Sequence, residues 1–155
     1  MKLGRGFTLL ELMVTIAVLA ILATVGVPSF RDLIQNNRVT TQTNELVSAL
    51  SFARTEAVKR GQSVEVVIAQ EGSGWRTAVE VGATNETLRV VDRGGSSVTI
   101  DGIAVDDPLI FSPTGVPDRA VTIGMEPGPD CAGNKRREIE VGMSGQVRTT
   151  KKSCN

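Results

Sequence analysis

A carboxylate lies inside a long apolar segment near the start of this chain. Glu11 follows Phe7-Thr-Leu-Leu10 and precedes a run from Leu12 to Phe30 that holds no charged residue. An ionised carboxylate in the hydrocarbon of a membrane costs about 3 kcal/mol or more, so acids in such segments are commonly functional. The alternative is that the Glu11 side chain extends to the headgroup region. The residue alone does not decide between a functional acid and a solvated one.

Other groups capable of catalysis do not combine into a site. The 155 residues contain no His, which removes the most common general base and metal ligand. No Ser-x-x-Lys motif lies in a predicted helix. Asp106-Asp107 precede a proline and are typical of a solvated turn rather than of paired catalytic acids. We therefore expect no enzymatic activity, no metal and no cofactor.

Both cysteines lie late in the sequence, at Cys131 and Cys154. Two cysteines cannot complete a four-ligand zinc site, and their spacing differs from the Cys-x-x-Cys of a reactive pair. An even pair outside the cytoplasm indicates one disulfide, with a reactive thiol pair as the alternative. Closing the 22 residues between them would stabilise the tail by about 3 kcal/mol.

The charges balance overall but not along the chain. Seventeen basic and seventeen acidic residues give a formal net charge of zero. From Cys131 onward, however, two glutamates face six cations, which are Lys135, Arg136, Arg137, Arg148, Lys151 and Lys152. Such a cluster could contact DNA phosphates without sequence preference. It could equally be a solvated basic edge, and the tail has no aromatic residue to stack on bases.

The elements that must position these groups begin with one long helix, expected from Phe7 to Arg60. From Phe7 to Phe30 it would span about 36 Å, more than the roughly 30 Å of a bilayer core. Lys2 and Arg5 precede this span, which predicts a cytoplasmic N-terminus. Pro28 either kinks the helix, with Thr24–Pro28 as a weak segment, or ends the membrane span.

The second half of the helix is amphipathic and continues into a β-rich region. Leu46, Leu50, Ala53 and Ala57 recur at helical spacing, and we expect charged residues such as Glu56 largely on other faces. Gly61 is the expected C-cap. Eight strands are predicted, over 63–69, 75–81, 86–91, 97–101, 109–112, 120–125, 137–142 and 146–150. A long helix followed only by strands predicts an α+β fold, with an antiparallel sheet packed on the C-terminal half of the helix.

The start of the chain resembles the class III signal of type IV pilins. The resemblance rests on Gly6-Phe-Thr-Leu-Leu-Glu11 between a short basic leader and an apolar helix. It implies that a prepilin peptidase cuts after Gly6 and methylates Phe7, and that Glu11 meets the N-terminal amine of a neighbouring subunit. The implied parts are a leader over 1–6, a transmembrane and assembly helix over 7–30 and a periplasmic domain over 31–155. The implied location is the inner membrane and then a fibre, with other pilins and the inner-membrane assembly platform as partners.

Two later stretches resemble the GspH/FimT/FimU family of minor pilins and pseudopilins. They are Leu109-Ile-Phe-Ser-Pro-Thr-Gly-Val-Pro117 and Ile139-Glu-Val-Gly-Met-Ser-Gly-Gln-Val-Arg148. The resemblance implies a minor pilin in pilus assembly or priming, and thereby in twitching motility, adhesion or natural transformation. Two alternatives are a FimT-like DNA-binding pilin for DNA uptake and a GspH-type pseudopilin of type II secretion. FimT proteins that bind DNA carry Gly-Arg-x-Arg, whereas this chain has Gln146 at the second position.

Overall fold

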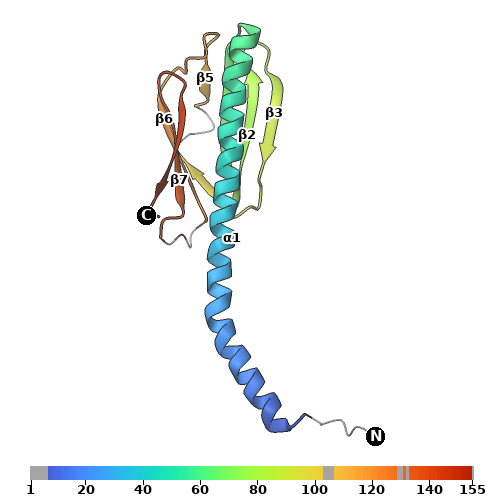
Figure 1. Ribbon diagram of the computed structural model, residues 1–155. Coiled ribbons are helices and arrows are strands. Elements are labelled where there is room, and N and C mark those ends of the chain that lie inside the picture. The colour runs from blue at the N-terminus through green and yellow to red at the C-terminus, as the bar shows by residue number, and fades with distance from the viewer. Residues whose placement is uncertain (1–6, 103–106, 129–130, 132, 155) are drawn as a thin grey trace, which may run out of the picture. The chain divides into compact units, whose positions relative to one another are not determined.

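The computed structural model describes residues 7–102, 107–128, 131 and 133–154, and its first element is one long helix (Figure 1). This helix, α1, runs from Leu9 to Arg60 and stays helical through Pro28. It starts two residues later than expected because Thr8 caps it, with the Thr8 Oγ1 accepting the Glu11 N–H at 3.2 Å. It ends as predicted at Gly61, whose φ of 64° suits a C-terminal cap.

The chain divides into two compact units, residues 1–35 and 36–155. Among the described residues of the first unit none is buried, and its large apolar side chains are exposed. Among the residues that the structure describes, the buried hydrophobic ones lie between Val39 and Val141, so the second unit holds the core.

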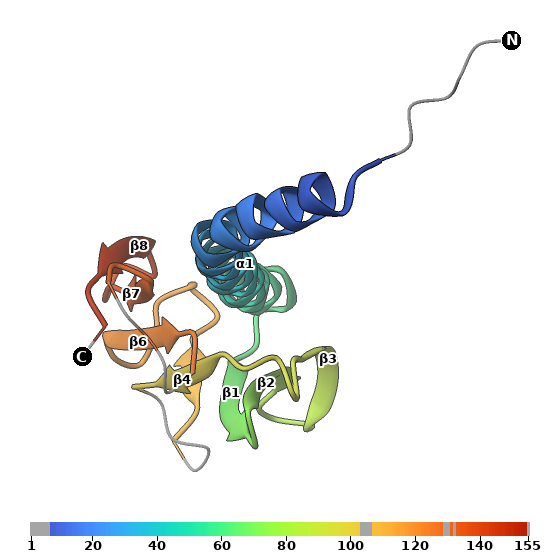
Figure 2. The same cartoon turned by 90° about the horizontal axis from the view of Figure 1, so that it is seen from below.

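All eight predicted strands are present. They are β1 (Val64–Glu71), β2 (Gly74–Val81), β3 (Glu86–Asp92), β4 (Thr99–Asp101), β5 (Leu109–Phe111), β6 (Val121–Glu126), β7 (Arg136–Val141) and β8 (Val147–Lys152). They form two four-stranded sheets rather than the single sheet expected, in the orders β3-β2-β1-β5 and β4-β6-β7-β8. The reason is that β4 pairs with β6, and β5 returns to pair with β1. Every pairing is antiparallel, and the two sheets lie against two flanks of the globular part of α1 (Figure 2).

The core lies between α1 and both sheets. The expected helix face is confirmed, because Leu46, Leu50, Ala53 and Ala57 are fully buried. Trp75 packs against this face, and its Nε1 donates to the Gln42 Oε1 at 2.7 Å, which satisfies the buried indole N–H. The burial of the helix by strands distant in sequence is what stabilises its second half.

Candidate functional site

The first part of α1 presents apolar side chains to its surroundings. Its most apolar 18-residue stretch is wholly unburied and is long and apolar enough to cross a membrane. Phe7 is 70% exposed, and the exposed apolar side chains continue beyond Phe30 to Leu33 and Ile34. Gly6, the expected cleavage position, lies outside the described residues. This apolar surface is the first candidate site.

Glu11 lies in the first turn of this helix. The Leu12 N–H donates to the Thr8 carbonyl at 3.2 Å, so Glu11 occupies the third helical position after the cap at Thr8. A carboxylate in the first turn interacts favourably with the helix dipole. Glu11 is exposed, so its side chain is accessible to a partner.

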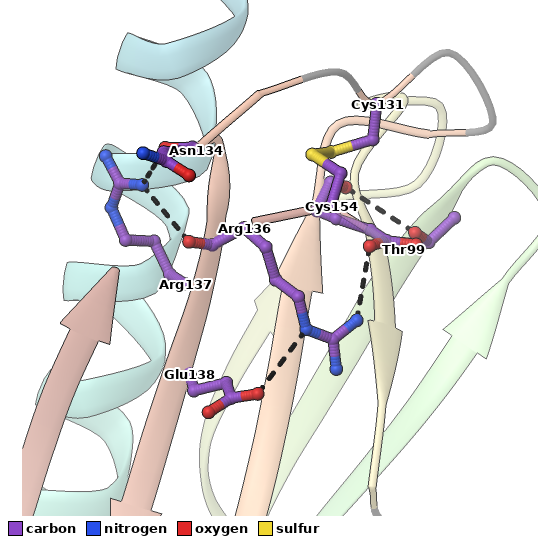
Figure 3. The surroundings of a disulfide bond; sticks show 8 residues. Thr99, Cys131, Asn134, Arg136, Arg137, Glu138 and Cys154 are labelled. Atoms are coloured by element: carbon purple, nitrogen blue, oxygen red, sulfur yellow. Dashed lines mark hydrogen bonds and ion pairs between the residues drawn. A yellow bond between two sulfur atoms is a disulfide. The ribbon is translucent and has the colours of Figure 1, made fainter. Parts of the chain in front are cut away.

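The predicted disulfide joins Cys131 to Cys154, with their Cα atoms 5.6 Å apart (Figure 3). Next to it the Cys154 N–H donates to the Gly133 carbonyl at 2.9 Å. The bridge therefore connects the end of β8 to the segment that leads into β7. This arrangement restrains the C-terminal end of the chain.

Arg136, the first residue of β7, is surrounded by carboxylates. Its guanidinium lies 2.9 Å from Asp101, 3.2 Å from Glu126 and 3.7 Å from Glu138, and its side chain is only 12% exposed. Figure 3 shows the Glu138 contact below the disulfide. Glu138 also pairs with the Lys152 Nζ at 3.5 Å. Two of the six predicted DNA-binding cations are thus neutralised within the sheet.

Arg137 points to the opposite side of β7 and is buried, with 5% exposure. Its Nη2 donates to the Asn36 Oδ1 at 2.7 Å and to the Thr40 Oγ1 at 3.2 Å. Its Nη1 donates to the carbonyls of Asn134 and Arg136. Burial lowers the pKa of this guanidinium. Arg137 therefore links β7 to α1 and does not present its charge to an external phosphate.

The six cations do not form one accessible surface. On the outer face of the pair β7–β8, Glu140 is opposite Arg148, and Arg136 is opposite Lys152. Lys135 also has an interaction partner. Within the described ranges, Arg148 and Lys151 are the cations of this cluster that are exposed and outside any ion pair. This face carries two acids among its cations, Glu138 and Glu140, so it lacks the continuous positive potential that favours DNA.

Sequence reasoning missed a contact among Arg54, Gly115 and Gly145. The Arg54 guanidinium donates to the carbonyls of Gly145 at 2.9 Å and Ser144 at 3.0 Å. Both glycines have positive φ, 78° and 73°, and a Cβ on Gly145 would lie 2.5 Å from the Gly115 oxygen. Gly115 and Gly145 each lie in a stretch that carries the family resemblance, and this was the only signal in the sequence.

Comparisons with known proteins bear on the family to which this chain belongs. The family model described as "Type II transport protein GspH" matches residues 42–145. That match covers most of the chain.

The chain belongs to the GspH family.

The model of the prokaryotic N-terminal methylation motif also matches this GspH-family protein, over residues 1–27. A fimbrial protein of Pseudomonas aeruginosa is 35% identical over 97 residues, 63% of this chain and 58% of that protein. This GspH-family protein thus spans just over half the length of that curated relative. Fimbrial protein Q of Moraxella bovis is 30% identical over 140 residues, 86% of this chain and 77% of that protein.

Solved structures confirm the fold of this GspH-family protein. The crystal structure of the type IV minor pilin FimU of Pseudomonas aeruginosa superposes with a TM-score of 0.62. It covers 77% of this chain and 96% of FimU at 19% identity, so the likeness concerns the fold alone. The expected α+β pilin fold is confirmed.

Proposed function

We propose that this GspH-family protein is a minor subunit of a type IV pilus and takes part in its assembly or priming. The observation that carries this proposal is the exposed apolar surface of α1 over residues 7–34, which includes Glu11. Such a surface is covered either by lipid or by other apolar helices. A bundle of these helices would form the fibre core, and the inner membrane would hold the subunit beforehand.

Glu11 would act as the assembly residue. In a helix bundle without lipid or water, a buried carboxylate needs a cationic partner. Cleavage between Gly6 and Phe7 by a prepilin peptidase would create such a cation at Phe7. Pairing of the Phe7 amine of one subunit with Glu11 of its neighbour would set the register between them. Lys2 and Arg5 would keep the N-terminus cytoplasmic, where the peptidase and the assembly platform act.

The test replaces Glu11 in the full chain and follows where the protein goes. We expect Glu11→Ala to remain in the inner-membrane fraction and to be absent from sheared fibres, because the helix stays apolar but loses its ionic contact. Asp32→Asn, which also neutralises an acid on α1, is the matched control and should enter fibres. Normal incorporation of Glu11→Ala would refute the role of this residue.

Type II secretion is the second candidate, and the description of the matching family favours it. A pseudopilus would use the same apolar helix and the same Glu11. Deleting the gene separates the candidates, because loss of a pilin reduces surface fibres and twitching, adhesion or transformation. Loss of a pseudopilin would instead retain exoproteins in the periplasm.

DNA uptake is a third candidate, favoured by the exposed Arg148 and Lys151 on β8. Each phosphate contact contributes a slope of about −0.9 to the dependence of log K on log salt. Two contacts predict a slope near −2, whereas the six expected from the sequence would give about −5. A mobility shift with the full chain in detergent, repeated across salt concentrations, measures this slope. No shift at low salt would exclude direct DNA binding.

A further inference from the structure

The two sheets have four edge strands, and β8 differs from the other three. β4 and β5 are three residues long, too short to offer many backbone groups. β3 is irregular, because Arg89 pairs with Val79 and Thr87 with Glu80, which leaves Leu88 without a partner. β8 has six residues and pairs with β7 in unbroken register. Long, regular edges are the ones that accept a further strand.

The outer edge of β8 carries unpaired backbone groups. The Gly142 N–H donates to the Gln146 carbonyl at 3.0 Å, and hydrogen-bonded pairs alternate from there along an antiparallel ladder. Arg148, Thr150 and Lys152 therefore bond to β7 through their backbone. The N–H and C=O groups of Thr149 and Lys151 point away from β7, and both residues are exposed. Figure 2 shows β8 at the end of its sheet.

The side chains of β8 select the sign of a partner's charge. Its sequence, Val-Arg-Thr-Thr-Lys-Lys, has three cations and no acid. Two copies of β8 would therefore repel each other if they paired edge to edge, since like charges directly opposite are destabilising. An acidic strand would be attracted, because Arg148 and Lys151 have no ion pair in the part of the chain that the structure describes.

We propose that the outer edge of β8 binds an extended acidic polypeptide segment by strand addition. The Thr149 and Lys151 backbone groups would hold the segment, and carboxylates on it would lie beside Arg148 on one face of the sheet or beside Lys151 on the other. The disulfide between Cys131 and Cys154 keeps β8 on β7 and so presents this edge in a fixed conformation. The surface differs from the apolar helix proposed for assembly and does not depend on entry into a fibre.

Strand addition and DNA binding use different groups of the same strand. DNA would contact the Arg148 and Lys151 side chains alone, whereas strand addition also needs the Thr149 N–H. Thr149→Pro removes this N–H and leaves every charge and the ladder to β7 in place, since proline is tolerated where an edge N–H faces solvent. Thr149→Val keeps the N–H and is the matched control.

The experiment measures fluorescence anisotropy with the full chain in detergent. The probe is a labelled eight-residue peptide of alternating Val and Glu with blocked ends. We expect salt-sensitive binding that weakens at least about threefold in Thr149→Pro and is unchanged in Thr149→Val. The same peptide with all backbone amides N-methylated keeps its charges, and we expect it to bind at least about tenfold more weakly.

Each result supports or overturns strand addition. Equal binding of the methylated and unmethylated peptides would overturn it in favour of simple charge attraction. No peptide binding at low salt would also overturn it, as would duplex DNA binding without peptide binding. If Thr149→Pro fails to fold, which loss of cooperative thermal unfolding would reveal, the methylated peptide on the unaltered protein still decides.

Discussion

Arg54 connects three segments that lie far apart in the sequence. Its guanidinium donates to the turn between β7 and β8 at Ser144 and Gly145, and its side chain would lie within 3.4 Å of a Cβ added to Gly115, in the turn after β5. Both glycines are buried where their backbones approach each other. The two stretches that carry the family resemblance therefore meet at one helix residue. Glycine is required at positions 115 and 145 because a larger residue would not fit this close packing.

Gly145→Ala is expected to destabilise the domain by about 3 kcal/mol, because the new Cβ strains a left-handed backbone and overlaps the Gly115 carbonyl. Gly61→Ala is the matched control, since its φ is 64° and nothing lies within 4 Å of its Cβ position. There we expect a loss of about 1 kcal/mol from backbone strain alone. Chemical denaturation measures the loss of stability in each variant. Equal losses in Gly145→Ala and Gly61→Ala would show that the close approach to Gly115 is unimportant.

Glu56 is buried, although the helical pattern placed it largely away from the apolar face. Its exposure is 9%, and Arg60 Nε donates to it at 2.8 Å while the Lys59 Nζ lies 3.4 Å away. The pattern failed because a charged residue with partners one turn away on the same helix can border the core. The hydrogen bond from Arg60, with a smaller contribution from Lys59, lowers the pKa of Glu56 despite its burial.

A lowered pKa in the folded state predicts how stability depends on pH. Ionised Glu56 stabilises the fold above the pKa it has when unfolded, and this contribution is lost as protonation sets in. We therefore expect stability to fall between about pH 5 and pH 3. Thermal unfolding of Glu56→Gln, which lacks the titrating group, should show a shallower decrease over this range. Identical pH profiles would contradict the contribution of Glu56.

At the scale of the elements, the disulfide and β7 hold the end of the chain together. The bridge joins the end of β8 to the segment before β7, while Arg137 on β7 bonds to α1. β8 itself pairs with β7 alone among the strands. Without the bridge, β8 would depend on its ladder with β7 and on the partly buried Val147.

Replacing both Cys131 and Cys154 by Ser should lower the free energy of unfolding by about 3 kcal/mol, since the unfolded chain regains the entropy of the opened loop. Hydrogen exchange should accelerate in β8 more than in β1 or β2. The unaltered protein under reducing conditions provides the control, and it should show the same loss of stability and the same faster exchange in β8 as the Cys-to-Ser variant. Unchanged exchange in β8 would show that the ladder alone holds the strand.

At the scale of the whole molecule, the two units have different surfaces. The described part of residues 36–155 contains the buried hydrophobic side chains, including those that α1 contributes. The described residues of the first unit contribute none. Folding stability therefore belongs to the second unit, and the apolar surface of the first is available to lipid or other helices.

A fragment of residues 36–155 should fold cooperatively and keep the disulfide, because it retains the full core and the Asn36 contact of Arg137. We expect its midpoint of thermal unfolding to lie within a few degrees of that of the full chain in mild detergent. Circular dichroism measures both. A fragment without a cooperative transition would show that the first unit contributes to stability.

Local patterns in the sequence determined much of this protein. The apolar run with Glu11, the helix end at Gly61, the eight strands and the cysteine pair were all predictable. Each depends on residue type and spacing along a short segment, where periodicity and turn residues act directly. The role of Glu11 in assembly remains a prediction, as does the kink at Pro28.

Only the tertiary structure decided how the strands divide and which charges are accessible. β4 pairs with β6 instead of joining a single sheet, and Arg136 and Arg137 lie on opposite sides of β7, one among carboxylates and one against α1. Cations that form one cluster in the sequence are therefore divided between the two faces of the β7–β8 pair, with Arg136, Arg148 and Lys152 on one face and Arg137 and Lys151 on the other. The reason is that strand register places neighbours in sequence on opposite faces and selects partners far along the chain, which no local pattern encodes.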